Sequence, residues 1–323
     1  MRRMWCLAAS AIVALWTCEL GLSAQKQQQV FINLAAPNGT PVTDLQASEV
    51  SITEDGVDCK IAKLEFVNWP IALQVLVDNG PRNTNPINPL RDGLKGLFEL
   101  MPDGVEMSLY TTAGRPRPIV KPTTEKQKMM DGISLIAPDG GAGMFLDALV
   151  EAAGRIDKDK TPNFPVIVMV GSDFGKVSAS DRDYQKLQDI IRTRAVTVHI
   201  IVMVGGAAEG ATGGAAQTEL GLAVTKLSGG RSENIATTTR LATLLPELGK
   251  TIAESDARQR RQYRVTYERP ANPKPQPRIG ATIRREGAFT LSLDGHRPYR
   301  KSGYGKQSPD ANRREFSCGP AGS

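Results

Sequence analysis

Three nearly continuous apolar segments constrain the fold of this chain more than any other feature. They span residues 71–78, 164–170 and 196–204, and stretches with helical periodicity lie between them. The first run ends on a carboxylate, Asp78. Strands that are apolar along their whole length are buried on both faces, as in parallel sheets covered by helices. We therefore expect residues 70–260 to form an α/β domain with a doubly wound, mostly parallel sheet.

Shorter β-like segments precede and follow this region. Three are expected before it, at residues 30–34, 50–54 and 60–67, and three after it, at residues 262–268, 278–284 and 288–293. Neither group has enough strands to bury two faces by itself. The simplest account is one small β-sandwich-like domain, formed by residues 25–69 and 261–300, into which the α/β domain is inserted. Residues 301–323 are polar and Gly-rich, and we expect them to be disordered.

The N-terminus has the pattern of a secretory signal peptide over residues 1–24. Arg2 and Arg3 precede an apolar run of about ten residues, and small residues follow it. A cut after Ala24 fits best, and a cut after Ser23 is the alternative. No later segment reaches the roughly 18 uninterrupted apolar residues of a spanning helix. The expected location is secreted or periplasmic, with no transmembrane segment after cleavage.

Composition limits the chemistry that the chain can perform. It has 2 His and 4 Cys in 323 residues, too few for zinc clusters or a dense disulfide framework. After cleavage Cys59 and Cys318 remain, and whether they pair is left open. No Ser or Cys stands in a nucleophile-elbow pattern, and no pair of acids has an acid–base arrangement. His199 lies in an apolar run and is interpreted as a core residue. We therefore expect the protein not to be an enzyme.

An ordered set of motifs carries a resemblance to a known family. The set lies between about residues 30 and 300, in segments 41–45, 52–56, 71–78, 140–149, 166–173, 227–230 and 261–267. In order and spacing these segments are similar to the bacterial VWFA-related family, which is built on the von Willebrand factor type A domain. The resemblance implies the Rossmann-like sheet of that domain, with a metal-ion-dependent adhesion site at the carboxyl ends of its strands.

In the family, that site holds Mg²⁺ through Asp-x-Ser-x-Ser, a Thr from a later loop and a further Asp, and the open position accepts a partner's carboxylate. In this chain the first element has Asp78, but Gly80 and Arg82 replace both hydroxyl residues. The loop of residues 140–144, which includes Gly143, has no hydroxyl, and Asp173 matches the last position. The resemblance therefore implies a degenerate site that keeps two carboxylates.

Two carboxylates are a poor Mg²⁺ site, because this ion requires six well-placed oxygen atoms. Arg82 would repel a divalent cation, and its guanidinium can neutralise Asp78 and Asp173 through charge-assisted hydrogen bonds. We hypothesise that Arg82 substitutes for the ion, so no cofactor is predicted. The alternative is a weak or rearranged Mg²⁺ site held by Asp78 and Asp173.

These features predict a non-enzymatic adhesion or scaffold module that binds a protein of unknown identity. The contact surface would be the loops around residues 80–89, 140–144, 173–178 and 205–216, which surround the degenerate site. The competing interpretation is a Mg²⁺-dependent adhesin that uses a rearranged site.

Basic charge is concentrated near the C-terminus. Residues 256–323 have 15 Lys and Arg against 6 Asp and Glu, a formal charge of +9. Six arginines stand out in this part of the chain: Arg258, Arg260, Arg261, Arg264, Arg284 and Arg285. The favoured interpretation is a solvated helix end and strand rim, partly explained by the helix dipole. The alternative is a face that binds an anionic envelope polymer rather than nucleic acid.

Overall fold

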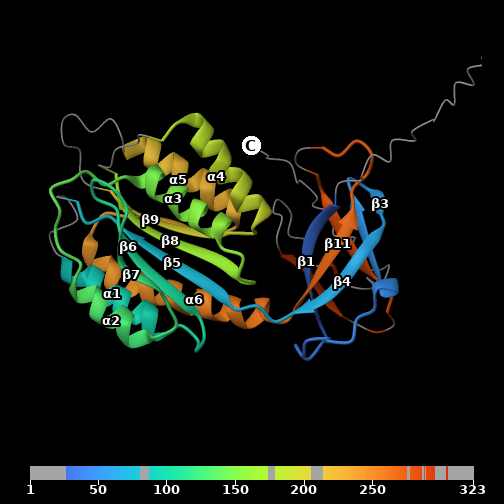
Figure 1. The fold of residues 1–323 in the computed structure, drawn as a ribbon. Coiled ribbons are helices and arrows are strands. Elements are labelled where there is room, and N and C mark those ends of the chain that lie inside the picture. Colours follow the sequence, from blue (N-terminus) through green and yellow to red (C-terminus); the bar gives the residue numbers. More distant parts are fainter. Residues whose placement is uncertain are drawn as a thin grey trace, which may run out of the picture.

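The computed structural model describes residues 27–80, 87–173, 179–204, 214–274, 277–285, 287, 289–294 and 303–304. These residues form an α/β domain and a smaller β domain, joined at a narrow waist (Figure 1). The expected signal peptide of residues 1–24, Arg82 and Cys318 lie outside the described residues, as do most residues of the loops 80–89, 173–178 and 205–216.

The α/β domain is built on a six-stranded sheet. Its order is β10-β9-β8-β5-β6-β7, and every neighbouring pair is parallel except β6 and β7. This confirms the predicted doubly wound, mostly parallel sheet. Chain order reverses between β5 and β8, the position where such sheets bind ligands. The strands are β5 (Ile71–Val77), β6 (Glu106–Thr111), β7 (Arg117–Thr123), β8 (Phe164–Ser172), β9 (Thr197–Met203) and β10 (Ser232–Ile235).

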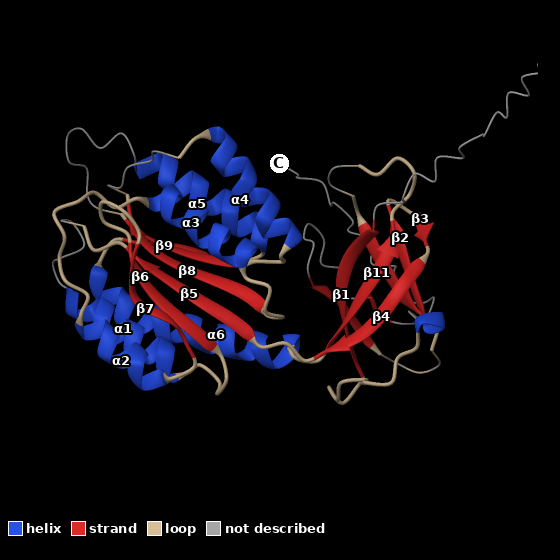
Figure 2. Cartoon of the chain, in the orientation of Figure 1, coloured by secondary structure: helices blue, strands red, loops and turns tan. Residues whose placement is uncertain are grey.

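Helices cover both faces of this sheet (Figure 2). One layer contains α1 (Ile87–Glu99), α2 (Lys126–Ser134) and α6 (Leu241–Gln259), and the other contains α3 (Phe145–Lys158), α4 (Asp181–Thr193) and α5 (Gly214–Ser228). A separate apolar core lies beneath each layer. All nine residues of β8 are buried, as its apolar sequence requires. No described helix has the length and apolar character needed to cross a bilayer.

The β domain draws strands from both ends of the chain. One sheet has the order β14-β13-β1-β11-β4 and the other β12-β2-β3. Their inner faces enclose a third core, which includes Ile32, Val265 and Tyr267. The strands are β1 (Gln27–Ala35), β2 (Val50–Glu54), β3 (Val57–Cys59), β4 (Ile61–Val67), β11 (Gln262–Glu268), β12 (Ile279–Ile283), β13 (Thr290–Asp294) and β14 (Gly303–Tyr304). β14 lies within residues 301–323, the segment expected to be disordered, and it pairs with β13.

Aromatic rings and hydrogen bonds join the two domains at the waist. The chain crosses there twice, between β4 and β5 and between α6 and β11. Phe31 of the β domain lies 5.1 Å from Phe164 and 5.9 Å from Trp69, measured between ring centroids. Asn33 Nδ2 donates to the carbonyls of Arg258 and Arg261, at 3.1 and 3.3 Å. The β domain is therefore packed against the amino-terminal end of β5, opposite the carboxyl ends of the parallel strands.

Candidate functional site

Two acidic residues follow the two strands at which chain order reverses. Asp78 comes directly after β5 and Asp173 directly after β8, and the two strands are parallel neighbours. Both residues are buried, with 2% and 6% of their surface exposed. The amide of Asp78 donates to the carbonyl of Val170, and that of Asp173 to the carbonyl of Met203. The end of the sheet therefore holds both acids beside the position where doubly wound folds bind ligands.

Nearby groups of the protein already contact the carboxylate of Asp78. Its Oδ1 accepts the amide hydrogen of Gly80 at 2.8 Å, and its Oδ2 accepts the hydroxyl hydrogen of Ser172 at 2.7 Å. The first bond closes a short turn of the kind that Asp favours, and the second links the ends of β5 and β8. Each oxygen of this buried carboxylate therefore has a hydrogen-bond donor supplied by the chain.

Glycines allow the loop of residues 140–144 to close over the same carboxylate. A Cβ atom at Gly143 would lie 2.2 Å from Oδ2 and 2.6 Å from Oδ1 of Asp78. A Cβ at Gly80 would lie 2.9 Å from the carbonyl oxygen of Gly141. Both distances are too short for a real side chain, so a serine at position 80 would not fit this arrangement. The two glycines therefore permit a close approach of backbone to Asp78.

Asn79 fixes the surrounding loops to one another. Its Nδ2 donates to the carbonyl of Ala137 at 2.7 Å, and its Oδ1 accepts the amide of Ala113 at 3.3 Å. The backbone of Asn79 also accepts the amide of Asp139. One side chain and its own carbonyl thus connect the end of β5 to the loop after β6 and to the loop before α3.

The described residues do not fit the Mg²⁺ site that the resemblance implies. Mg²⁺ takes six oxygen ligands at about 2.0–2.1 Å. Gly80 and Gly143 have no side-chain oxygen, and the Cα of Gly143 occupies space next to the carboxylate of Asp78. Both oxygens of that carboxylate also accept hydrogen bonds within the protein.

The structure brings together Asp78, Gly80 and Gly143 and places Asp173 at the neighbouring strand end. Arg82 lies outside the described residues, so its pairing with the two acids stays a hypothesis. The sequence interpretation missed Ser172 and Asn79. Each stands directly next to a predicted site acid at the end of a predicted strand, and this position is a signal that could have identified both.

The contacts of His199 and Cys59 favour structural roles for both residues. His199 is 7% exposed, and its Nδ1 accepts the amide of Arg231 at 3.1 Å. Cys59 forms no disulfide within the described part of the chain, and burial, followed by the charge of Glu54, raises the pKa of its thiol. A protonated thiol is a weak nucleophile. Among the described residues, no three His, Cys, Asp or Glu side chains gather as metal ligands would.

Internal ion pairs involve half of the arginine cluster noted in the sequence. Arg260 Nε lies 2.6 Å from Asp256, and Arg264 Nη2 lies 2.6 Å from Glu65. Arg285 pairs with both Asp44 and Glu49, and hydrogen bonds from its guanidinium lower the pKa of each carboxyl. Less of the cluster's charge is therefore available to an external polyanion than the sequence indicates.

A scan against protein-family models finds no match, and neither does a search of curated proteins. Several solved structures have a distantly similar fold. A von Willebrand factor type A protein from Catenulispora acidiphila is 10% identical, with a TM-score of 0.47, 85% of this chain covered and 71% of that one. The pilus adhesin SpaC from Lactobacillus rhamnosus GG is 9% identical, with a TM-score of 0.47 and coverages of 79% and 46%. Proximal thread matrix protein 1 from the mussel byssus, with a zinc-occupied MIDAS motif, is 14% identical, with a TM-score of 0.45 and coverages of 58% and 48%.

Proposed function

We propose that this chain is an exported, non-enzymatic protein-binding module, an adhesin or scaffold component, which recognises its partner without a metal ion. The contact surface is the set of loops at the carboxyl ends of the parallel strands. One observation carries the proposal: the carboxylate of Asp78, at the position where the sheet's chain order reverses, is buried and bonded to Ser172 and Gly80.

This closure changes what the site can recognise. With the position next to Asp78 filled by Gly143, recognition falls to the rim around it, which includes the exposed Arg115 after β6. Asn79 holds the loops of that rim in a fixed relation. A rim of loops on a rigid sheet suits a protein surface, because preformed loops lose little conformational entropy on binding.

Calorimetry of the processed protein with Mg²⁺ and Mn²⁺ tests the metal status. We expect no binding at micromolar concentrations. Micromolar binding that Asp78→Ala abolishes would overturn the proposal and favour the alternative, a Mg²⁺-dependent adhesin that uses Asp78 and Asp173.

Affinity capture from envelope extracts, run with and without EDTA, tests the surface. We expect the same captured protein in both conditions, and a loss of capture by Arg115→Glu. The matched control is Lys160→Glu, an equal charge change on an exposed residue just beyond α3, at the other end of the sheet. Undiminished capture by the Arg115→Glu variant would contradict the proposed location of the contact surface. N-terminal sequencing of exported protein should begin at Gln25, or at Ala24 if the alternative cut is used.

A further inference from the structure

A cavity opens at the waist, at the end of the sheet opposite Asp78. Its volume is about 620 Å³, and both domains and the crossing segments line it. The walls include Phe66 at the end of β4, Pro102 after α1, and Asp256, Arg260 and Arg261 at the end of α6. We call it the waist pocket. It has apolar walls and a charged end, which is the combination that binding pockets use for orientation.

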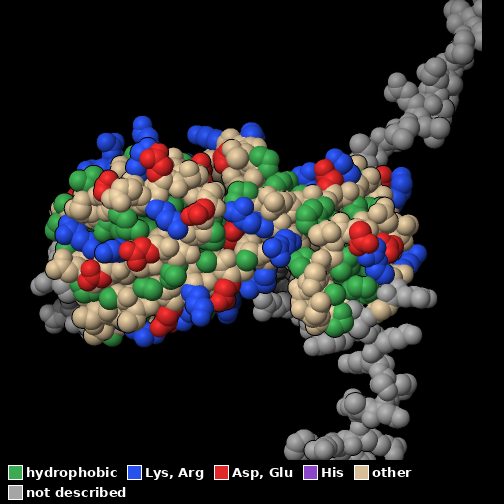
Figure 3. All heavy atoms as spheres, turned by 90° about the horizontal axis from the view of Figure 1, so that it is seen from below, with side chains coloured by type: hydrophobic (Ala, Val, Ile, Leu, Met, Phe, Trp, Pro, Cys, Tyr) green, Lys and Arg blue, Asp and Glu red, His purple; other side chains and the backbone are tan. Residues whose placement is uncertain are grey.

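The waist pocket carries a positive charge that the described residues do not neutralise. Asp256 is 1% exposed, and its two oxygens accept the amide of Ile71 at 2.9 Å and Arg260 Nε at 2.6 Å. Asp256 therefore neutralises Arg260 and holds the start of β5. Arg261 is exposed and has no ion pair with any described acid. Figure 3 views the molecule from below and shows Lys and Arg side chains at the waist.

An exposed aromatic ring stands beside this charge. Phe66 is 42% exposed, although it is one of the larger apolar side chains. Its ring packs edge-on against Tyr263, with 5.2 Å between centroids, so it is held in place rather than free to turn away. A fixed, half-exposed aromatic ring next to an arginine is the composition of an interface hot spot.

Phe66 also belongs to an edge strand of the larger sheet in the β domain. β4 has seven residues, no proline, and a partner strand on one side only, β11. The edges of the other large sheet are protected, because β7 contains Pro118 and Pro122 and β10 has only four residues. Proline and short length are two ways in which proteins block the addition of a strand. An open edge favours an extended peptide over a compact ligand.

We propose that the waist pocket and the edge of β4 form a second protein-binding site, which takes an extended segment of a partner protein. The segment carries a carboxylate for Arg261 and, next to it, an apolar side chain for Phe66. This site is independent of the loops at the carboxyl ends of the strands, and either proposal can fail without the other.

A phage-displayed library of random 12-residue peptides, selected on the processed protein, tests this inference. We expect the enriched peptides to share an Asp or Glu beside an aromatic or aliphatic residue. A synthetic peptide of the enriched sequence should lose about tenfold or more in affinity, measured by fluorescence anisotropy, for Arg261→Glu and for Phe66→Ser.

Lys186→Glu, an equal charge change on the exposed side of α4, should leave the affinity unchanged. Both exposed positions at the waist should tolerate substitution, and an unchanged melting temperature identifies variants that keep the fold. Absence of enrichment, enriched peptides without an acid, or full affinity in a folded Arg261→Glu variant would each overturn the proposal.

Discussion

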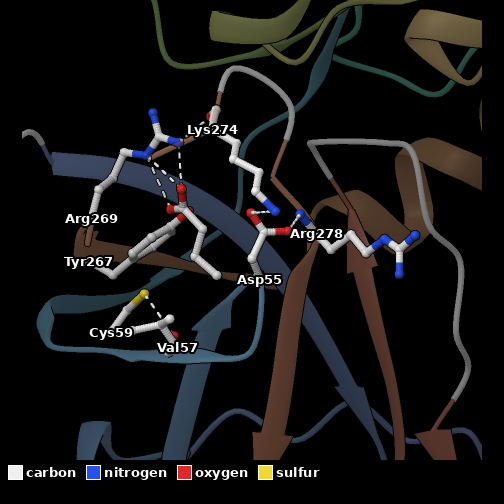
Figure 4. Close-up of polar contacts among 8 residues, drawn as sticks. Asp55, Val57, Cys59, Tyr267, Arg269, Lys274 and Arg278 are labelled. Carbon is white, nitrogen blue, oxygen red and sulfur yellow. Dashed lines mark hydrogen bonds and ion pairs between the residues drawn. The ribbon is translucent and has the colours of Figure 1, made fainter. Parts of the chain in front are cut away.

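Two carboxylates are equally buried in this molecule, and the chain stabilises them differently. Asp78 of the α/β domain and Glu54 of the β domain are each 2% exposed. The donors described at Asp78 are a hydroxyl and a backbone amide, which are neutral. Glu54 instead accepts both Nε and Nη2 of Arg269, together with the hydroxyl of Tyr267 at 3.2 Å (Figure 4).

Glu54 therefore belongs to a structural ion pair, whereas Asp78 holds strand ends and loops in position. Arg269 follows β11 and Glu54 ends β2, so the pair joins the two sheets of the β domain. The hydrogen bonds that Arg269 donates to Glu54 raise the pKa of Arg269, while burial, followed by the charge of Glu54, raises the pKa of Tyr267. At Asp78, the hydrogen bonds from Ser172 and Gly80 fix the ends of β5 and β8 beside each other.

The largest effect is expected from Arg269→Met, which leaves the charge of Glu54 buried without its cation. Breaking a buried ion pair on one side costs about 3–5 kcal/mol. Urea unfolding should report that loss in the free energy of unfolding. The double variant Glu54→Met with Arg269→Met should recover much of it, and a double variant as unstable as the single one would contradict this role for the pair.

A smaller effect is expected when the closure over Asp78 is forced open. Gly143→Ala adds a methyl group where the carboxylate of Asp78 lies, and overpacking of this kind costs about 1–3 kcal/mol. Gly140→Ala is the matched control, because nothing lies within 4 Å of a Cβ at that position. Adding Asp78→Ala to Gly143→Ala should restore part of the stability lost to the clash. Equal melting temperatures for the two glycine variants would show that the loop is not closed.

Gln262 sharpens the comparison, because among the described residues this buried polar side chain has neither a charged nor a neutral hydrogen-bond partner. It is 0% exposed, and neither its Oε1 nor its Nε2 has a hydrogen-bond partner among the described residues. Gln262→Met keeps the shape and removes the unsatisfied amide, so we expect a gain of about 1 kcal/mol in urea unfolding. Gln262→Glu should be destabilising, and a stabilising Glu would indicate an unrecognised cation nearby.

The smallest effect concerns the partly exposed ion pairs of Arg285 with Asp44 and Glu49. Hydrogen bonds from Arg285 lower the pKa of Glu49 and of Asp44 below their ordinary values. A lowered pKa in the folded state contributes stability above the unfolded pKa of about 4, and this is lost as pH falls through the folded value. Melting temperatures from pH 6 to pH 3 should therefore converge for the wild type and Arg285→Gln. A constant difference over that range would exclude the contribution.

The central strands of the sheet could be predicted from the sequence, because a strand that is buried on both faces is apolar along its whole length. β5, β8 and β9 were predicted from uninterrupted apolar runs, and they form the centre of the sheet. β10 was missed, since its sequence Ser-Glu-Asn-Ile is polar and only four residues long. Its place at the sheet edge explains that polarity, because an edge strand has one neighbour and is less buried.

The candidate site was predictable only in part. Asp78 and Asp173 follow apolar runs, so their positions at strand ends could be inferred. The missing hydroxyls at Gly80 and Gly143 were also visible in the sequence. The close approach of Gly143 to Asp78 was not visible, because it depends on the path of a loop that is distant from Asp78 in the sequence. The bond from Ser172 likewise depends on β8 lying beside β5.

The double crossing at the waist has a consequence for how this architecture can be dismantled. Val67 and Gln262, the last residue of β4 and the first of β11, face each other as register partners in an antiparallel pair. Replacing residues 68–261 by a two-residue Asn-Gly turn would therefore close an ordinary β-hairpin. One hairpin connection of the smaller domain therefore accommodates the whole α/β domain, and the strand pairing of β4 with β11 continues up to the two residues that flank it.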